Sequence, residues 1–173
     1  MVRTLLSSRT LVAAAAVTLM ALVGLATPSA AVASPPDAVF DFPAGLACDF
    51  PLRLEVFASP LRVFREFRDK NGNVVRILTA GKGNTLVFTN LDNNETLTLN
   101  THGSVEHITL NPDGTQTQSI TGHNVLTLFP TDVPPGPSTT LHLGRVVFIV
   151  DTLGVFTLQS VSGRATDICA ELS

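Results

Sequence analysis

The sequence has no tryptophan and no tyrosine, although it has ten phenylalanines. Proteins that bind sugars commonly present flat Trp or Tyr rings that carry a polar group, and Phe has no such group. We therefore do not expect an aromatic carbohydrate-binding platform. The phenylalanines lie among Val, Leu and Ile in short apolar runs, which indicates that nearly all of them belong to a hydrophobic core.

Basic residues are scarce as well. The chain has 11 Lys and Arg against 14 Asp and Glu, and two of the arginines fall in the first ten residues. Nucleic-acid phosphates require a basic surface, so we expect no nucleic-acid partner. In the densest basic stretch, residues 62–70, a strand would point Arg65 away from Arg62 and Arg68. We interpret this stretch as a solvated hairpin edge rather than as a binding site.

The sequence also lacks the spacings that common metal and catalytic sites require. Metal ligands on a strand favour positions two apart, which project from one face, and no His-x-His pair occurs. No Gly-x-Ser-x-Gly turn is present for a serine hydrolase. We predict no metal site, no cofactor and no identifiable catalytic residue, and we place the histidines at strand edges or in loops: His102, His107, His123 and His142.

Cysteine is limited to Cys48 and Cys169. A metal pair or a catalytic thiol would need partners, but neither cysteine has another Cys nearby or a His within about twenty residues. An even count of this kind predicts a disulfide in an oxidising compartment. The bond would close a loop of about 120 residues, which the chain-entropy model values at roughly 4–5 kcal/mol.

The N-terminal segment has the three parts of a secretory signal peptide. Arg3 and Arg9 make its start positive, residues 11–25 form an uncharged apolar core, and residues 31–33 read Ala-Val-Ala, a small-x-small cleavage signal. A retained membrane anchor is the alternative, but it needs about 20 apolar residues, and residues 27–29 (Thr-Pro-Ser) interrupt the run. We expect residues 1–33 to be removed, with no membrane span remaining and with residues 34–173 exported, either free outside the cell or associated with its envelope.

Residues 34–173 are enough for one domain and too few for two ordinary ones. Short apolar runs recur there at intervals of about eight to twelve residues between turn signals, which is typical of an all-β sandwich or barrel. The expected strands cover residues 52–58, 62–68, 74–79, 85–90, 96–101, 104–110, 115–121, 125–129, 145–150 and 155–161.

Turn chemistry predicts how these strands are joined. Asn71-Gly72, residues 91–95 (Leu-Asp-Asn-Asn-Glu) and residues 111–114 (Asn-Pro-Asp-Gly) favour antiparallel hairpins. Ser59-Pro60 leaves a short helix as an alternative for residues 61–67. Four prolines within residues 130–137 exclude a sheet interior and indicate a crossing loop or lid. We expect a monomeric, all-β antiparallel meander of about nine or ten strands. A closed or nearly closed barrel is preferred because it removes exposed edges, and a two-sheet β-sandwich is the alternative.

Five short sequences carry a resemblance to a known group. They are Cys-Asp-Phe-Pro (residues 48–51), Lys-Asn-Gly-Asn (70–73), Asn-Pro-Asp-Gly-Thr (111–115), Gly-Arg-Val-Val-Phe (144–148) and Asp-Ile-Cys (167–169). With these, the chain resembles small secreted all-β proteins of actinobacteria whose function is unknown. The resemblance supports secretion and implies no catalytic residue.

Three functional hypotheses follow. The leading one is a secreted, non-enzymatic β-domain that binds a small apolar ligand or a partner outside the cell or in its envelope. The second is a small barrel enzyme of the cyclase or isomerase type, for which His107, His123 and His142 are the residues to test. The third is a structural or adhesive envelope protein, or an enzyme inhibitor, that acts through its outer surface; fold alone does not choose among them.

Overall fold

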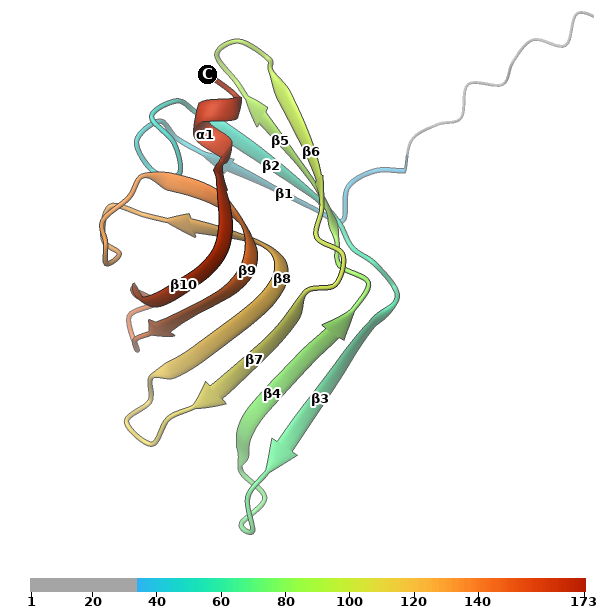
Figure 1. Ribbon diagram of the computed structural model, residues 1–173, viewed down its shortest axis with the longest axis vertical. Coiled ribbons are helices and arrows are strands. Elements are labelled where there is room, and N and C mark those ends of the chain that lie inside the picture. Colours follow the sequence, from blue (N-terminus) through green and yellow to red (C-terminus); the bar gives the residue numbers. More distant parts are fainter. Residues whose placement is uncertain (1–33) are drawn as a thin grey trace, which may run out of the picture. The chain divides into compact units, whose positions relative to one another are not determined.

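Ten strands and one short helix make up the fold of residues 34–173, the part of the chain that the computed structural model describes (Figure 1). The predicted signal peptide, residues 1–33, lies outside the described residues. No helix within residues 34–173 has the length and apolar character needed to cross a membrane. The elements are β1 (Ala38–Phe42), β2 (Leu52–Phe57), β3 (Arg62–Arg68), β4 (Val74–Gly81), β5 (Thr85–Asn90), β6 (Thr96–Asn100), β7 (Val105–Leu110), β8 (Gln116–Leu128), β9 (Ser138–Val150), β10 (Phe156–Asp167) and α1 (Ile168–Glu171).

The strands form two separate antiparallel sheets. The smaller sheet has the order β1-β2-β5-β6, and the larger one has the order β10-β9-β8-β7-β4-β3. The all-β prediction is confirmed, but the closed barrel is wrong, because each sheet keeps two edge strands. Two antiparallel sheets, one of four strands and one of six, are consistent with the alternative prediction of a β-sandwich. The chain passes between them after β2, after β4 and after β6, so the fold is not a simple meander.

The predicted hairpins are confirmed strand for strand. β3 pairs with β4, β5 with β6 and β7 with β8, all antiparallel. The helix alternative after Ser59-Pro60 is wrong, since β3 begins at Arg62 and is almost wholly exposed, as expected of a solvated hairpin edge. In β6, Leu97 and Leu99 face the core while Thr96 and Thr98 are exposed, so this strand has one apolar and one polar face.

Three hairpin turns share one construction, in which an Asp or Asn precedes a Gly by three residues. In the β3–β4 turn the Gly72 amide donates to the Asp69 carbonyl, and Gly72 has a φ of 87° that other residues adopt only with strain. The Asp69 carboxylate accepts hydrogen bonds from the Asn73 and Asn71 amides, and these bonds lower the pKa of that carboxyl group. Asn111 and Asp151 begin the equivalent turns of the larger sheet.

A row of glycines bends the larger sheet across three strands. Gly122 of β8 pairs with Gly144 of β9, which also pairs with Gly163 of β10. A Cβ atom on Gly144 would lie 2.0 Å from the Ser162 carbonyl oxygen, so only glycine fits. Figure 1 shows β8, β9 and β10 curving sharply. We infer that the missing side chains along this row permit the curve.

The curve folds the larger sheet back upon itself. Leu126 and Leu128 belong to the second half of β8, whereas Val146 and Phe148 pair with its first half. All four residues nevertheless form one buried hydrophobic cluster. An uncurved sheet would hold these two groups apart, so this cluster is the direct result of the bend.

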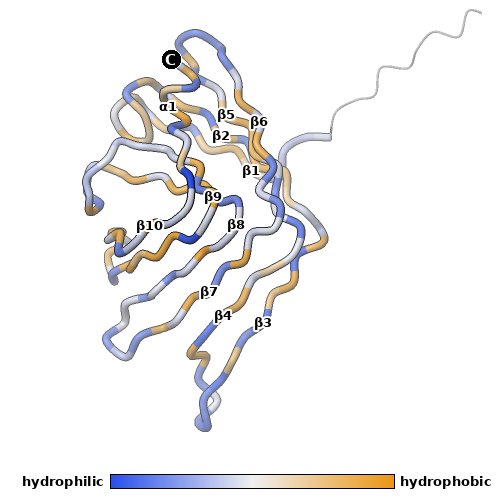
Figure 2. Tube along the Cα trace, viewed as in Figure 1, coloured by the Kyte–Doolittle hydropathy of each residue, from blue (hydrophilic) through white to orange (hydrophobic). Residues whose placement is uncertain are grey.

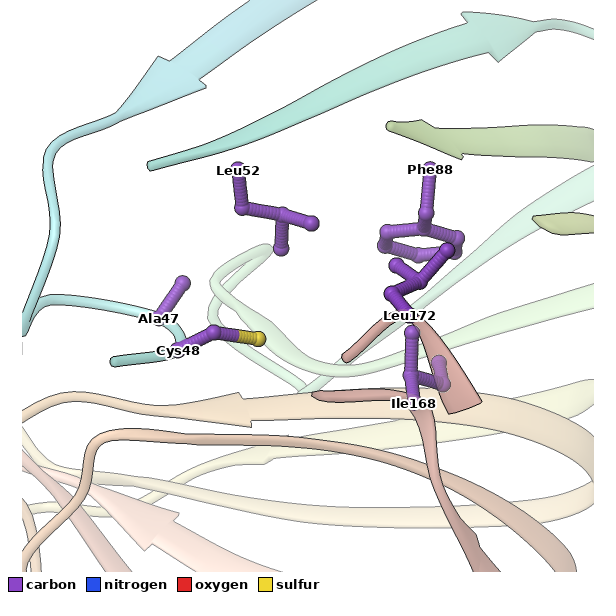
Figure 3. Close-up of a cluster of buried hydrophobic side chains, with 6 residues drawn as sticks. All are labelled: Ala47, Cys48, Leu52, Phe88, Ile168 and Leu172. Carbon is purple, nitrogen blue, oxygen red and sulfur yellow. The ribbon is translucent and has the colours of Figure 1, made fainter. Parts of the chain in front are cut away.

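A second hydrophobic cluster joins the two sheets and the C-terminal helix (Figure 3). Leu52 of β2 and Phe88 of β5 point from the smaller sheet toward Ile168 and Leu172 at the C-terminus, and all four side chains are fully buried. Partly buried residues of β8 and β9 close the cluster from the larger sheet. Fully burying each such side chain contributes about 1.5–3 kcal/mol, so this cluster is the main cohesion between the sheets.

The predicted disulfide is confirmed and lies at the edge of this second cluster. Cys48 and Cys169 are bonded, with their Cα atoms 5.6 Å apart and their positions 121 residues apart in sequence. Ala47, beside Cys48, is completely buried, and its carbonyl accepts a hydrogen bond of 2.9 Å from the Thr139 hydroxyl of β9. The bond therefore fastens the segment before β2 to helix α1 at the point where both meet the larger sheet.

Candidate ligand-binding site

An apolar cavity of about 280 Å³ lies inside the bend of the larger sheet. Its walls come from both limbs of the bent β8, from β9 and from the start of β10, because the sheet folds back there. Side chains of Ile120 and Leu126 of β8 line it together with Phe148 and Phe156. The two phenylalanine rings are stacked with their centroids 4.9 Å apart, so they form a flat aromatic wall.

The proline loop, residues 130–137, is held beside the cavity by Asp132. This carboxylate is buried and lines the cavity, and it accepts hydrogen bonds from the Phe129 amide at 2.6 Å and the Phe156 amide at 2.8 Å. Val133 adds a parallel bridge to β10, in which its amide donates to the Phe156 carbonyl. Both carboxylate oxygens are thus engaged by the backbone, and Asp132 serves to position the loop.

A polar hollow of about 260 Å³ lies on the other side of Ile120 and Val125, which line both spaces. It is lined by Arg62 of β3, Glu106 of β7 and His123 of β8. Two further residues of this hollow, Ser104 and Asn124, are hydrogen-bonded to each other through the hydroxyl and the amide oxygen. This arrangement offers polar groups of both signs to a small molecule at the junction of the two sheets.

The histidines that an enzyme would use do not come together. His123 lines the polar hollow, and its Nδ1 lies 3.1 Å from the His102 carbonyl oxygen. His107 lies on the opposite face of the larger sheet, where it lines a different hollow. His142 is buried, which corrects the expectation that all four histidines lie at edges or in loops. Within residues 34–173, no group of three potential metal ligands gathers closely enough to hold a metal ion.

His142 and Asn124 form a buried polar pair that sequence reasoning missed. They are direct cross-strand neighbours on β9 and β8, and each is less than a tenth exposed. The Nδ1 atom of His142 and the Nδ2 atom of Asn124 both lack a hydrogen-bond partner among the described residues. Burial lowers the pKa of His142 below its ordinary value of 6.5, so the imidazole is neutral at neutral pH.

The glycines are the sequence signal that could have revealed this site. Gly122, Gly144 and Gly163 each interrupt a run of strand-forming residues, and a glycine inside a strand often marks a bulge, a tight bend or a close approach of backbones. The strand expected at residues 115–121 stops short of Gly122, whereas β8 continues through this glycine to Leu128. No comparable signal marked Asn124 or His142, whose burial depends on the bend.

No protein-family model, no curated protein and no solved structure matches this chain. The fold and the cavities therefore have to be interpreted from their own geometry. The resemblance to small secreted actinobacterial proteins stays a prediction, beside the established features of a small all-β chain with one disulfide.

Proposed function

We propose that residues 34–173 form a non-enzymatic domain that binds a small apolar molecule in the apolar cavity. The observation that carries this proposal is the cavity of about 280 Å³ between the aromatic wall of Phe148 and Phe156 and the side chains of Ile120 and Leu126. Ligand pockets of about 300–1,000 Å³ are usual, so the occupant would be small. Export of the domain, with the ligand met outside the cell, remains part of the proposal.

The geometry favours binding over catalysis. Asp132 is the charged group that lines the cavity, and its two carboxylate oxygens already accept backbone hydrogen bonds. His123 and His107 face two other spaces, and His142 is buried. Thr127, the other polar side chain of the lining, carries a hydroxyl, which is neither an acid nor a base at neutral pH. A cyclase or isomerase of the kind considered from the sequence would need at least one available acid or base at its apolar cavity.

The test uses naphthalene as a probe, added to the folded, oxidised protein and followed by backbone amide NMR shifts. We expect saturable shifts that centre on the amides of Phe148 and Phe156. The variant Ile120→Phe fills the cavity and should weaken naphthalene binding by about tenfold or more, equivalent to 1.4 kcal/mol of lost contact. Ile108→Phe is the matched control, since Ile108 is a half-buried isoleucine on the same sheet face but outside the cavity lining.

Circular dichroism and the unfolding midpoint establish that both variants are folded before they are compared. A wild-type protein that shows no saturable shifts would overturn the proposal. The same holds if Ile120→Phe and Ile108→Phe bind naphthalene equally well. Mass spectrometry of a solvent extract from protein purified without denaturation then identifies the natural occupant.

A further inference from the structure

The larger sheet carries a second hollow, of about 550 Å³, on the face opposite to Ile120 and Glu106. It extends over four neighbouring strands, β4, β7, β8 and β9, and shares no lining residue with the apolar cavity. We name this surface the arginine face, after Arg65, Arg76 and Arg145, which the strand register places on it together. It is independent of the apolar cavity and of the function proposed for that cavity.

The arginines of this face have no acidic partner. Among residues 34–173 the ion pairs are Arg53 with Asp41 and Arg68 with Glu66, so Arg76 and Arg145 are unpaired. No carboxylate belongs to the lining of the hollow. A chain with fewer basic than acidic residues thus collects unpaired cations on one sheet face, and this charge is complementary to an anionic ligand.

Local contacts hold these guanidinium groups in place. Arg76 lies over the ring of Phe67 at 4.2 Å from its centroid, and Arg65 lies over the same ring at 5.1 Å. The Nε of Arg145 donates to the Ser119 hydroxyl at 3.0 Å, which leaves its terminal nitrogens available. Anchored guanidinium groups lose less conformational entropy when they pair with a carboxylate than free ones do.

The distance between the two lining arginines suits an extended ligand. Arg76 and Arg145 are three strands apart across the sheet and four residues apart in register. With strand spacings of about 4.8 Å and about 3.3 Å per residue, their Cα atoms are about 20 Å apart. An extended chain of repeated anionic groups can therefore contact both arginines at once.

Hydroxyl groups form the floor between the arginines. They both donate and accept hydrogen bonds, as sugar hydroxyls do. The Phe67 ring is covered by the guanidinium groups of Arg65 and Arg76, and the hollow itself is lined by one imidazole, that of His107. These hydroxyls belong to Thr109, Thr117, Ser119 and Thr121. Three of them already have one partner each: Thr117 accepts from the Asn111 side-chain amide, Ser119 accepts from Arg145, and Thr121 donates to the Val105 carbonyl. Each keeps further capacity, since a hydroxyl can donate one hydrogen bond and accept two.

We propose that the arginine face binds a linear acidic polysaccharide whose carboxylates pair with Arg76 and Arg145 and whose hydroxyls contact the threonine and serine floor. This site needs no aromatic sugar platform, because charge and hydroxyl matching replace ring stacking. The domain would then bind a polymer on the arginine face and a small molecule in the apolar cavity.

The test measures binding of hexagalacturonate, a linear chain of six uronic acids, to the oxidised protein by calorimetry at low salt. We expect binding that weakens as salt is added, since exposed charges are screened, and no binding of neutral maltohexaose. The double variant Arg76→Gln/Arg145→Gln should bind at least about tenfold more weakly, because each lost charge-assisted hydrogen bond alone accounts for about that factor.

The matched control is Lys70→Gln/Arg164→Gln, which removes the same net charge from two exposed basic residues that line neither the hollows nor the apolar cavity. The affinity of this control for hexagalacturonate should stay within about twofold of the wild-type affinity, because surface substitutions far from a site usually have small effects. Equal losses in the two double variants would show general electrostatic attraction and overturn the proposal. Absence of binding to the wild-type protein, or tighter binding of a single-stranded oligonucleotide with equal charge, would also overturn it.

Discussion

At the scale of single residues, the unusual feature is a histidine and an asparagine in positions where neighbouring strand residues are apolar. His142 and Asn124 are cross-strand partners with one unpartnered nitrogen each among the described residues. An unsatisfied buried donor or acceptor costs about 1–3 kcal/mol, so the pair lowers the stability of the domain. Strained or poorly satisfied groups concentrate at functional sites, and Asn124 does line the polar hollow.

The burial of His142 predicts a specific pH dependence of stability. Its pKa in the folded protein lies below its ordinary value of 6.5, so the unfolded chain binds more protons as the pH falls. The free energy of unfolding is therefore unaffected by this group above pH 6.5, where the imidazole is neutral in both states. It decreases as the pH falls from 6.5 toward the pKa of His142 in the folded protein. Denaturant unfolding of wild type and His142→Gln between pH 5 and pH 8 should give a flatter profile for the variant.

His123→Gln is the control for this measurement, since His123 is exposed. Its free energy of unfolding should keep the wild-type slope with pH. If His142→Gln keeps that slope as well, the acid sensitivity of the domain arises from other groups.

At the scale of the elements, the bend of the larger sheet is the feature on which the proposed ligand site depends. Gly144→Ala places a Cβ atom 2.0 Å from the Ser162 carbonyl oxygen, and a backbone atom cannot move aside without separating β9 from β10. We expect a loss of about 3 kcal/mol or more in the free energy of unfolding. Denaturant titration at neutral pH measures this loss, and naphthalene binding should disappear with the cavity.

Gly72→Ala separates the effect of the clash from the general cost of replacing glycine. Gly72 has a φ of 87° but nothing within 4 Å of a Cβ atom, so its replacement should cost only about 1 kcal/mol. Similar losses for Gly72→Ala and Gly144→Ala would mean that the close approach of β9 and β10 does not fix the bend.

The hairpins could be predicted from the sequence because each depends on a few adjacent residues. Asn71-Gly72 and the turn at residues 111–114 determine which strands pair, and those pairs are present. The pairing of β4 with β7 could not be predicted in this way, because residues 82–104 cross to the other sheet and return between them. The predicted closure into a barrel is wrong because the sequence offers no local signal for it: the alternation of apolar and polar residues along a strand is the same in barrels and in sandwiches.

The candidate site was predictable only in its composition. The sequence predicts phenylalanines inside the fold and a crossing loop or lid at residues 130–137, and that loop does lie beside the cavity that Phe148 and Phe156 line. Its walls, however, come from Ile120 and Leu126 on either side of Gly122, which were assigned to two separate strands. The curvature that brings them together depends on glycines of three strands in one register, and register between distant strands is not encoded locally.

At the scale of the whole molecule, one hydrophobic cluster and one covalent bond hold the two sheets together. The cluster around Leu52, Phe88 and Ile168 joins the smaller sheet to helix α1, and Cys169 of that helix is bonded to Cys48. Figure 2 shows hydrophobic residues along β2 and β5 and hydrophilic tips on the hairpins. Phe42 of β1 adds a ring contact with Phe129 after β8, with the centroids 5.9 Å apart, so the smaller sheet is attached around this corner of the molecule.

Loss of the disulfide should therefore affect the entire fold. The bond joins residues 121 apart, and a loop of that size is worth about 4–5 kcal/mol in the chain-entropy model, against about 5–15 kcal/mol for the stability of a typical domain. We expect Cys48→Ser/Cys169→Ser to lower the denaturant midpoint strongly, and a reducing agent to shift the wild-type midpoint to that of the variant. The variant itself should not respond to the reducing agent. A wild-type midpoint that is unchanged under reduction would show that the cluster alone holds the sheets together, and the domain would then be equally suited to a reducing compartment.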